Sequence, residues 1–179
     1  MRNTYFMKRI YLPLTKEVRV KLRAGDELLL CGKIYTARDA AHKRFHNTLK
    51  EKKPLPLDIR DNLIYYCGPT PAGLGMKIGA CGPTTSKRMD GFTPKLLKMG
   101  LAGSIGKGRR SPDVIEAVKR YKALYLVTVG GAGAYLSKRI KEVNVIAYSD
   151  LGPEAVYEFY VEDFPVTVAI DANGKSIFK

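Results

Sequence analysis

The sequence lacks tryptophan altogether and has only two histidines and three cysteines among its 179 residues. Its cysteines, Cys31, Cys67 and Cys81, are odd in number and contain no Cys-x-x-Cys pair, which argues against a disulfide framework. In a reducing compartment we interpret them as small buried side chains. The alternative is an iron–sulfur cluster with three thiolate ligands and one open iron, although the clustered spacing typical of such sites is missing.

Long apolar runs are also missing. The uncharged stretch at residues 123–136 is too short to cross a membrane and is interrupted by glycines. The basic N-terminus, residues 1–16, contains no apolar segment of signal-peptide length. We therefore expect a cytoplasmic protein with no membrane partner.

Acidic side chains are scarce, because 17 Asp and Glu residues face 31 Lys and Arg residues and leave a formal net charge of +14. Such a surplus attracts anions, whether nucleic acid, a membrane surface or small acids held in a site. A solvated basic surface explains the same surplus without any ligand. Length and composition, with 45% hydrophobic and 27% charged residues, predict one globular domain over residues 1–179.

The first part of the chain predicts two strands followed by a helix. Residues 18–36 have the pattern of a strand, a turn at residues 24–26 and a second strand. A helix should begin near Thr36, which is a suitable N-cap residue. The apolar residues of this helix recur every four positions and form one face: Ala37, Ala41, Phe45 and Leu49.

The rest of the chain alternates strands and helices around one irregular segment. Residues 62–67 predict a strand that enters a loop rich in Gly, Pro and Thr at residues 68–83. Helices are predicted at residues 84–90, 93–99 and 111–121, and the glycines at residues 130, 131 and 133 lead into another that runs to residue 141. Residues 100–108 predict a short strand and turn, and residues 123–129 and 143–148 predict strands. Residues 155–178 are strand-like, with a hairpin turn at residues 171–174. This order favours one α/β domain with a mixed sheet and strand-rich termini.

Two phosphate-binding motifs are present only in part. Gly106-Lys107 lacks the first glycine and the Ser or Thr of a P-loop, and the glycines at residues 131 and 133 lack the third glycine of a dinucleotide site. The stronger signal is a local repeat, since Cys-Gly-Pro-Thr at residues 67–70 recurs at residues 81–84.

Basic and hydroxyl side chains at three places predict an anion pocket. Thr84 and Arg88 lie four residues apart and therefore on one face of the predicted helix, whose first N–H groups suit a carboxylate. Arg38 and Asp39 fall in the first turn of the earlier predicted helix. Together with Lys107 on a glycine-flanked turn, two separated arginines would bind a small dicarboxylate.

Three segments, in this order and spacing, resemble the β-subunit (equivalent to the C-terminal domain) of class I, iron–sulfur-dependent fumarate hydratases. They are Ala-Arg-Asp-Ala-Ala-His at residues 37–42, Gly-Pro-Thr-Thr-Ser-Lys-Arg-Met-Asp at residues 82–90 and Gly-Lys-Gly-Arg-Arg-Ser at residues 106–111. L-tartrate dehydratase β-subunits share the pattern. The resemblance covers essentially the whole chain and implies a single swivelling β/β/α three-layer domain.

The resemblance also implies a partner and a cofactor. The domain would close over a separate α-subunit, in an α2β2 assembly, and that subunit would carry a 4Fe-4S cluster on three cysteines of its own. No residue of this chain is then expected to bind metal. The implied activity is the reversible hydration of fumarate to malate, a step of the tricarboxylic acid cycle.

The resemblance further implies roles for individual residues. Three side chains are expected to bind substrate carboxylates: Arg38, Arg88 and Lys107. Thr84 is expected to contact the substrate as the catalytic base, which a hydroxyl near its normal pKa can do only if a cation and a partner carboxylate activate it. Three more residues are expected to orient this machinery: Asp39, His42 and Thr85. Lys87 stands at a position that is often small in the family, so its charge should alter the potential of the pocket.

Two other functions stay open at this point. The first is dehydration of L-tartrate to oxaloacetate, because the substrates differ by one hydroxyl and no residue that would reject it is identified. The second is a stand-alone nucleic-acid-binding domain, which the net charge allows. The aromatic residues lack the tightly spaced basic and aromatic motif of an RNA-recognition module, which disfavours the second.

Overall fold

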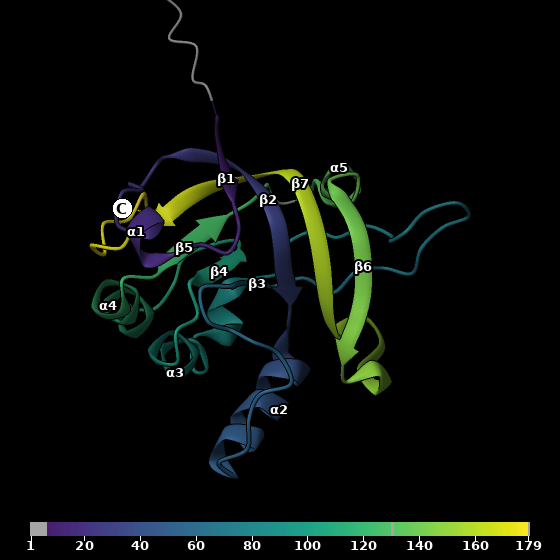
Figure 1. Cartoon of the computed structure of the whole chain (residues 1–179), viewed down its shortest axis with the longest axis horizontal. Coiled ribbons are helices and arrows are strands. Elements are labelled where there is room, and N and C mark those ends of the chain that lie inside the picture. The colour runs from purple at the N-terminus through teal and green to yellow at the C-terminus, as the bar shows by residue number, and fades with distance from the viewer. Residues whose placement is uncertain (1–6, 130, 179) are drawn as a thin grey trace, which may run out of the picture.

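The computed structural model describes residues 7–129 and 131–178 (Figure 1). The strands are β1 (Lys8–Tyr11), β2 (Glu27–Thr36), β3 (Leu63–Tyr65), β4 (Gly103–Gly106), β5 (Leu124–Val127), β6 (Ile140–Ala147) and β7 (Val156–Ile170). The α-helices are α1 (Lys16–Arg19), α2 (Asp39–Lys50), α3 (Thr93–Lys98), α4 (Pro112–Tyr121) and α5 (Gly133–Ser137). Two short 3₁₀ helices, η1 (Ser86–Met89) and η2 (Ser149–Glu154), complete the described elements.

The strands form one mixed sheet in the order β1-β2-β3-β4-β5-β7-β6, and β2 also pairs with β7. Neighbours from β1 to β5 run parallel, whereas β7 runs antiparallel to β2, β5 and β6. The additional pairing closes β2, β3, β4, β5 and β7 into a ring, which β1 and β6 flank (Figure 1). The pairing of β2 with β7 shifts its register between Leu30 and Gly32, and Gly32 has a φ of +125° that favours glycine.

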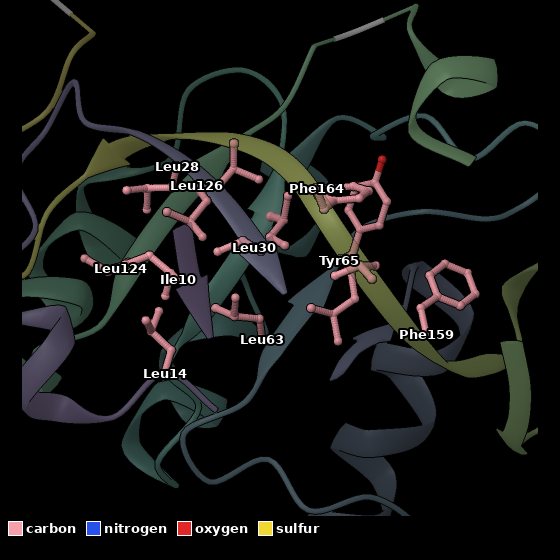
Figure 2. Packing of buried hydrophobic residues seen from close by; sticks show 14 of the residues in the cluster. Ile10, Leu14, Leu28, Leu30, Leu63, Tyr65, Leu124, Leu126, Phe159 and Phe164 are labelled. Carbon is pink, nitrogen blue, oxygen red and sulfur yellow. The ribbon is translucent and has the colours of Figure 1, made fainter. Parts of the chain in front are cut away.

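Alternating side chains along the strands divide the core into two layers. Leu63 and Tyr65 of β3 point into a cluster enclosed by the strands, whose other large members include Leu28, Leu30, Leu124, Leu126 and Phe164 (Figure 2). Ile64 of β3 and Tyr125 of β5 belong to a second cluster with apolar side chains of α2, α3 and α4. Helices therefore cover the outer face of the parallel strands, and the predicted mixed α/β class is confirmed.

Two predicted elements at the start of the chain are wrong. Part of the expected first strand is helix α1, where the buried Arg19 guanidinium donates to the carbonyl of Leu14 (2.5 Å) and to Asp61 Oδ1 (2.7 Å). Helix α2 begins at Asp39 rather than near Thr36. Thr36 stays in β2, because its hydroxyl accepts a hydrogen bond from the backbone N–H of Tyr157 at 3.2 Å. In both places contacts between distant segments override the local pattern.

Later elements follow the sequence more closely. Helix α4 begins directly after Ser111, as predicted, and the turn at residues 171–174 is closed by a 2.8 Å hydrogen bond from Gly174 N–H to the carbonyl of Asp171. Helix α5 ends at Ser137, short of the predicted residue 141, because β6 already begins at Ile140. Gly130, one of the glycines predicted to lead into that helix, lies outside the described residues. No helix within residues 7–129 and 131–178 is long and apolar enough to span a bilayer.

Candidate active site

The residues singled out from the sequence gather where three parallel strands end. Arg38 follows β2, the segment of Tyr66 and Gly68 follows β3, and Lys107 follows β4 directly. In open and mixed α/β sheets, ligands bind outside the carboxyl ends of the parallel strands. The topology therefore brings segments that are far apart in the sequence to one edge of the sheet.

Arg38 lies at the N-cap position of α2, packed against the backbone of Gly68. A Cβ at Gly68 would stand 2.7 Å from Arg38 Nη1, so a larger residue there would displace the guanidinium. Arg38 Nε lies 3.8 Å from Glu154 Oε1, and this nitrogen is buried without a hydrogen-bond partner among the described residues. The Arg38 side chain is 24% exposed, and its unused Nε donor is suited to receive an anionic oxygen.

Asp39 connects the start of α2 to the second arginine. Arg88 Nε donates to Asp39 Oδ1 at 3.1 Å, and Arg88 Nη2 lies 3.0 Å from Asp39 Oδ2. The Arg88 side chain is 55% exposed and that of Asp39 is 34% exposed. The segment that carries Arg38 therefore contacts Arg88 through the carboxylate of Asp39, whereas the Arg38 guanidinium itself faces Glu154.

His42 is completely buried one turn into α2. Its Nδ1 lies 2.8 Å from the carbonyl oxygen of Arg38, and the rings of Phe45, Tyr66 and Phe92 surround it at centroid distances of 5.5–5.8 Å. Burial is the main cause that lowers the pKa of His42 from 6.5 to about 4. The ring is therefore neutral near pH 7, with Nδ1–H donating to Arg38, and it fixes the backbone of that residue.

The predicted helical face that joins Thr84 to Arg88 is wrong. The 3₁₀ helix η1 begins at Ser86, so Thr84 lies before it in extended structure. The backbone N–H and the hydroxyl of Thr84 both donate to the carbonyl of Tyr66, at 2.7 Å and 2.9 Å. Thr84 thereby lies beside the end of β3 because of a backbone contact rather than helical periodicity.

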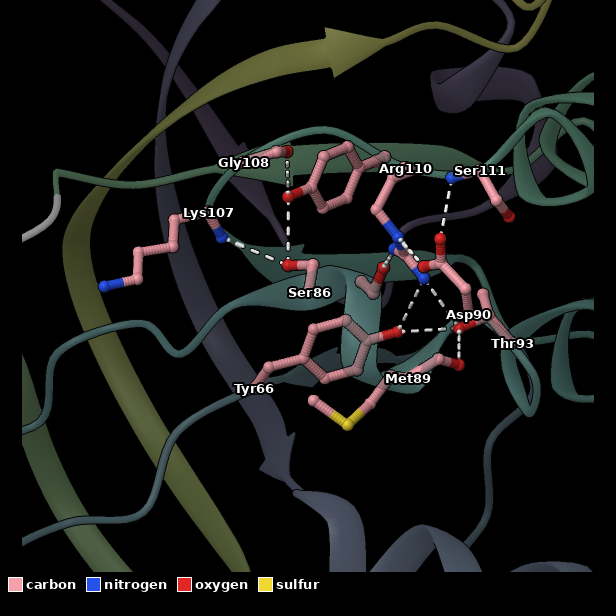
Figure 3. Close-up of polar contacts among 11 residues, drawn as sticks. Tyr66, Ser86, Met89, Asp90, Thr93, Lys107, Gly108, Arg110 and Ser111 are labelled. Atoms are coloured by element: carbon pink, nitrogen blue, oxygen red, sulfur yellow. Dashed lines mark hydrogen bonds and ion pairs between the residues drawn. The ribbon is translucent and has the colours of Figure 1, made fainter.

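Thr85 and Lys107 are brought together by main-chain pairing. They form an isolated parallel bridge, in which Ser86 N–H donates to the carbonyl of Lys107 at 3.1 Å. The Lys107 side chain is exposed and extends away from the cluster around Arg110 (Figure 3). Lys87 is also exposed. The predicted carboxylate ligands Arg38, Arg88 and Lys107 are thus three cations on three different segments.

Arg110 and Asp90 are structurally important residues to which the sequence analysis assigned no role. The Arg110 side chain is 0% exposed, and its Nε donates to Asp90 Oδ1 at 2.6 Å. The other guanidinium nitrogens donate to Ser104 (2.9 Å) and Thr93 (2.7 Å), while Asp90 Oδ2 accepts from the backbone of Ser111 at 2.6 Å (Figure 3). Both residues belong to the segments that carry the resemblance. Their burial could not be predicted from the sequence, because they stand among other charged residues.

The three cysteines do not converge on one point. Cys67 and Cys81 lie in the core enclosed by the strands, whereas the thiol of Cys31 contacts Asp163 Oδ1 at 3.6 Å. Among the residues that the structure describes, no three His, Cys, Asp or Glu side chains are grouped so that they could hold a metal ion. The cysteines of this chain therefore do not fit the three-thiolate interpretation.

The fold and the site define an α/β domain with basic side chains on the segments that follow its parallel strands. Residues 3–179 match the family described as "Fumarase C-terminus". The chain belongs to this family, and the resemblance drawn from its motifs is confirmed.

Relatives with names of two kinds match the chain. A protein from Methanocaldococcus jannaschii, provisionally named L(+)-tartrate dehydratase subunit beta, is 37% identical over 183 residues, which cover 97% of this chain and 92% of that protein. The anaerobic class I fumarate hydratase of Escherichia coli is 38% identical and the mitochondrial fumarate hydratase 1 of Leishmania major is 39% identical. These matches cover 92% and 85% of this chain but only 31% and 28% of the two enzymes.

Proposed function

We propose that the chain is the β-subunit of a two-subunit hydro-lyase that hydrates fumarate reversibly to malate. The observation that carries this proposal is that Arg88 is paired with Asp39, the residue after Arg38, while Thr84 is bonded to the carbonyl of Tyr66 just after β3. Two guanidinium groups on separate segments provide two forks for a substrate with two carboxylates. The family and the fumarate hydratase relatives support the same reaction class.

Each residue at the pocket edge then has a chemical role. Arg38, Arg88 and Lys107 bind the substrate carboxylates. The Thr84 hydroxyl donates a hydrogen bond to the Tyr66 carbonyl at 2.9 Å, so its oxygen can accept a hydrogen bond from the substrate; to take a substrate proton it must first pass its own proton to a carboxylate of the partner. Because an unperturbed hydroxyl is a weak base, the nearby cations and a carboxylate from the partner have to activate it.

Three further residues hold the proposed substrate-binding residues in position. Asp39 pairs with Arg88, and His42 donates to the carbonyl of Arg38. Thr85 pairs with Lys107 through the main chain. We further propose that residues 1–179 form one domain that swivels to close the pocket, since every described strand joins the same sheet.

The 4Fe-4S cluster that the resemblance implies has no ligand set among the described residues of this chain. We therefore assign the cluster to a separate α-subunit, where its open iron would act as a Lewis acid on the substrate. The E. coli and Leishmania relatives are about three times as long as their match to this chain, so they have room for such a part in the same polypeptide. An α2β2 assembly in the cytoplasm is the arrangement we propose.

An apolar arm marks where the partner would bind. The loop between β3 and η1 extends away from the body of the domain (Figure 1), and Thr70 and Ala80 close its base by a 3.0 Å hydrogen bond. Leu74 near its tip is fully exposed and Met76 is 51% exposed. Exposed large apolar side chains of this kind are typical of interaction sites. Both ends of the arm meet the pocket, at Gly68 and Thr84.

A tartrate dehydratase β-subunit is the second candidate, because the Methanocaldococcus relative has nearly the same length as this chain and bears that name. The two candidates differ in the substrate hydroxyl that the pocket accepts. A site that hydrogen-bonds this extra hydroxyl rejects the substrate without it, whereas an apolar site discriminates weakly.

Reconstitution tests the proposal. The purified chain alone should hydrate no fumarate, and addition of a cluster-loaded α-subunit from the same genome should produce activity toward fumarate above that toward L-tartrate. Iron should be found in the α-subunit fraction only. Hydration by the chain alone, at a rate comparable to the complex, would contradict the division of labour between the subunits.

A further inference from the structure

The turn between β4 and α4, which begins with Lys107, is held by a closed set of hydrogen bonds. The backbone N–H of Lys107 donates to Ser86 Oγ at 3.1 Å. Ser86 Oγ lies 2.9 Å from the phenol oxygen of Tyr125, and this oxygen lies 2.9 Å from the carbonyl of Gly108 (Figure 3). The contacts start and end on neighbouring residues of the same turn.

The direction of each hydrogen bond follows from the groups involved. A carbonyl only accepts, so the Tyr125 hydroxyl must donate to Gly108. Ser86 must then donate to the Tyr125 oxygen, while it accepts from the Lys107 N–H. Burial is the main cause that raises the pKa of Tyr125 to about 12, so the phenol keeps its proton near neutral pH. The hydroxyls of Ser86 and Tyr125, which we call the relay, therefore each donate one hydrogen bond and accept another, and such a chain of hydrogen bonds is cooperatively strengthened.

The surroundings leave the relay little freedom. Ser86 is completely buried, and a Cβ at Gly106 would lie 1.8 Å from its hydroxyl oxygen, so only glycine admits Ser86 at this place. The guanidinium of Arg110 lies over the Tyr125 ring, 4.8 Å from its centroid, and its ion pair with Asp90 anchors the other end of the turn. The turn is thus fixed on both sides of Gly108, whose φ is +81°.

We propose that Ser86 and Tyr125 are positioning residues that set the location of Lys107 at the mouth of the carboxylate pocket. The inference rests on the proposed function, because it assigns Lys107 a substrate carboxylate. It adds residues that touch neither substrate nor cofactor and act only through the backbone of Lys107. An ammonium on a flexible stem recognises a carboxylate as a point charge, so its backbone position decides where that charge can reach.

Amide hydrogen exchange tests the relay without any activity. In the full chain, the Lys107 N–H should exchange about tenfold faster or more in Ser86→Ala and in Tyr125→Phe than in the unaltered chain. The Thr84 N–H, which donates to the Tyr66 carbonyl, should keep its rate in both variants. Ser137→Ala is the matched control, because it removes a buried hydroxyl that donates to a helical carbonyl in α5 at 2.9 Å.

A double-mutant cycle tests whether the relay acts through Lys107. In the reconstituted complex, Ser86→Ala should lower kcat/KM about tenfold, whereas in the background of Lys107→Ala it should cause almost no further loss. Tyr125→Phe should behave the same way, and Ser137→Ala should change neither value. Equal losses from Ser86→Ala with and without the Lys107 ammonium would overturn the proposal.

The two measurements separate this inference from the proposed function. If the Lys107 N–H exchanges at an unchanged rate in both variants, the relay does not hold the turn and the inference is wrong. If the unaltered complex has no hydro-lyase activity, the proposed function is wrong, and the proposed binding of a substrate carboxylate by Lys107 is wrong too. Faster exchange together with a non-additive cycle is the result expected.

Discussion

Replacement of Arg88 by lysine should reduce activity far more than removal of the neighbouring charge at Lys87. In the structure, Arg88 Nε donates to Asp39 Oδ1 at 3.1 Å and Nη2 lies 3.0 Å from Oδ2, so this guanidinium already faces a carboxylate. A lysine ammonium keeps the charge but cannot present two parallel donors. Lys87 stands one position earlier in η1 and is exposed, so it contributes only to the local potential.

The expected losses of kcat/KM in the two variants differ by about an order of magnitude. A hydrogen bond to a charged group contributes about 1.5–3 kcal/mol, so Arg88→Lys should lower kcat/KM by about 10- to 150-fold. Lys87→Ala should cost less than about 1 kcal/mol, as expected of an exposed charge. The free energy of unfolding should barely change in Arg88→Lys, because the Arg88 side chain is 55% exposed and an exposed ion pair contributes only about 0.2–1 kcal/mol.

The assay is steady-state fumarate hydration by the reconstituted complex at fixed salt, with the thermal midpoint of each variant as the check on folding. A loss at Lys87→Ala that equals or exceeds the loss at Arg88→Lys would mean that Arg88 does not bind the substrate. A large fall of the Arg88→Lys midpoint would also refute the reasoning, since it would show a structural role for the fork.

Three further outcomes are expected. Because the pKa of buried His42 is about 4 when folded and 6.5 ordinarily, its contribution to stability, about 3 kcal/mol, should be lost as pH falls from about 6.5 to 4. Denaturant titrations across this range should show a flatter curve for His42→Asn, and parallel curves would contradict it. Asp90→Asn should lower the free energy of unfolding by about 3–5 kcal/mol, since it leaves the charge of Arg110 buried and unpaired; an unchanged urea midpoint would count against this. Leu74→Asp with Met76→Asp should weaken association with the α-subunit in sedimentation without shifting the thermal midpoint of the chain.

The sequence predicts the elements well where local chemistry is sufficient. Helix α4 begins at Pro112, directly after Ser111, since a serine suits the N-cap and a proline suits the first helical position. The sequence fails where a distant contact decides. Thr36 has the chemistry of an N-cap, yet it pairs with β3 and accepts from Tyr157 of β7, so the helix starts later. The sequence around Thr36 cannot predict that β7 lies beside it.

The site shows the same division. The motifs predict that Arg38 and Arg88 bind one substrate, and this stays a prediction; the structure pairs Arg88 with Asp39, the neighbour of Arg38. The predicted helical spacing of Thr84 and Arg88 is wrong, because η1 begins at Ser86 and Thr84 is held by the Tyr66 carbonyl. Arg110 was missed, since a run of basic residues ordinarily predicts a solvated surface. Its burial depends on Asp90, Thr93 and Ser104, which come from three other segments.

Carboxylates of the chain itself explain how Arg38 and Arg88 keep their places before a substrate binds. Arg88 is paired with Asp39, and Arg38 Nε lies 3.8 Å from Glu154 Oε1, so each guanidinium already faces one acid. Exposed or half-exposed pairs of this kind contribute little stability, which makes them easy to displace or extend. Asp39 and Glu154 belong to different elements, α2 and η2, so the two forks stay apart rather than closing on one acid. Two separate monocarboxylates would each lose translational and rotational entropy on binding. A dicarboxylate that binds both arginines loses this entropy only once, so it binds more tightly.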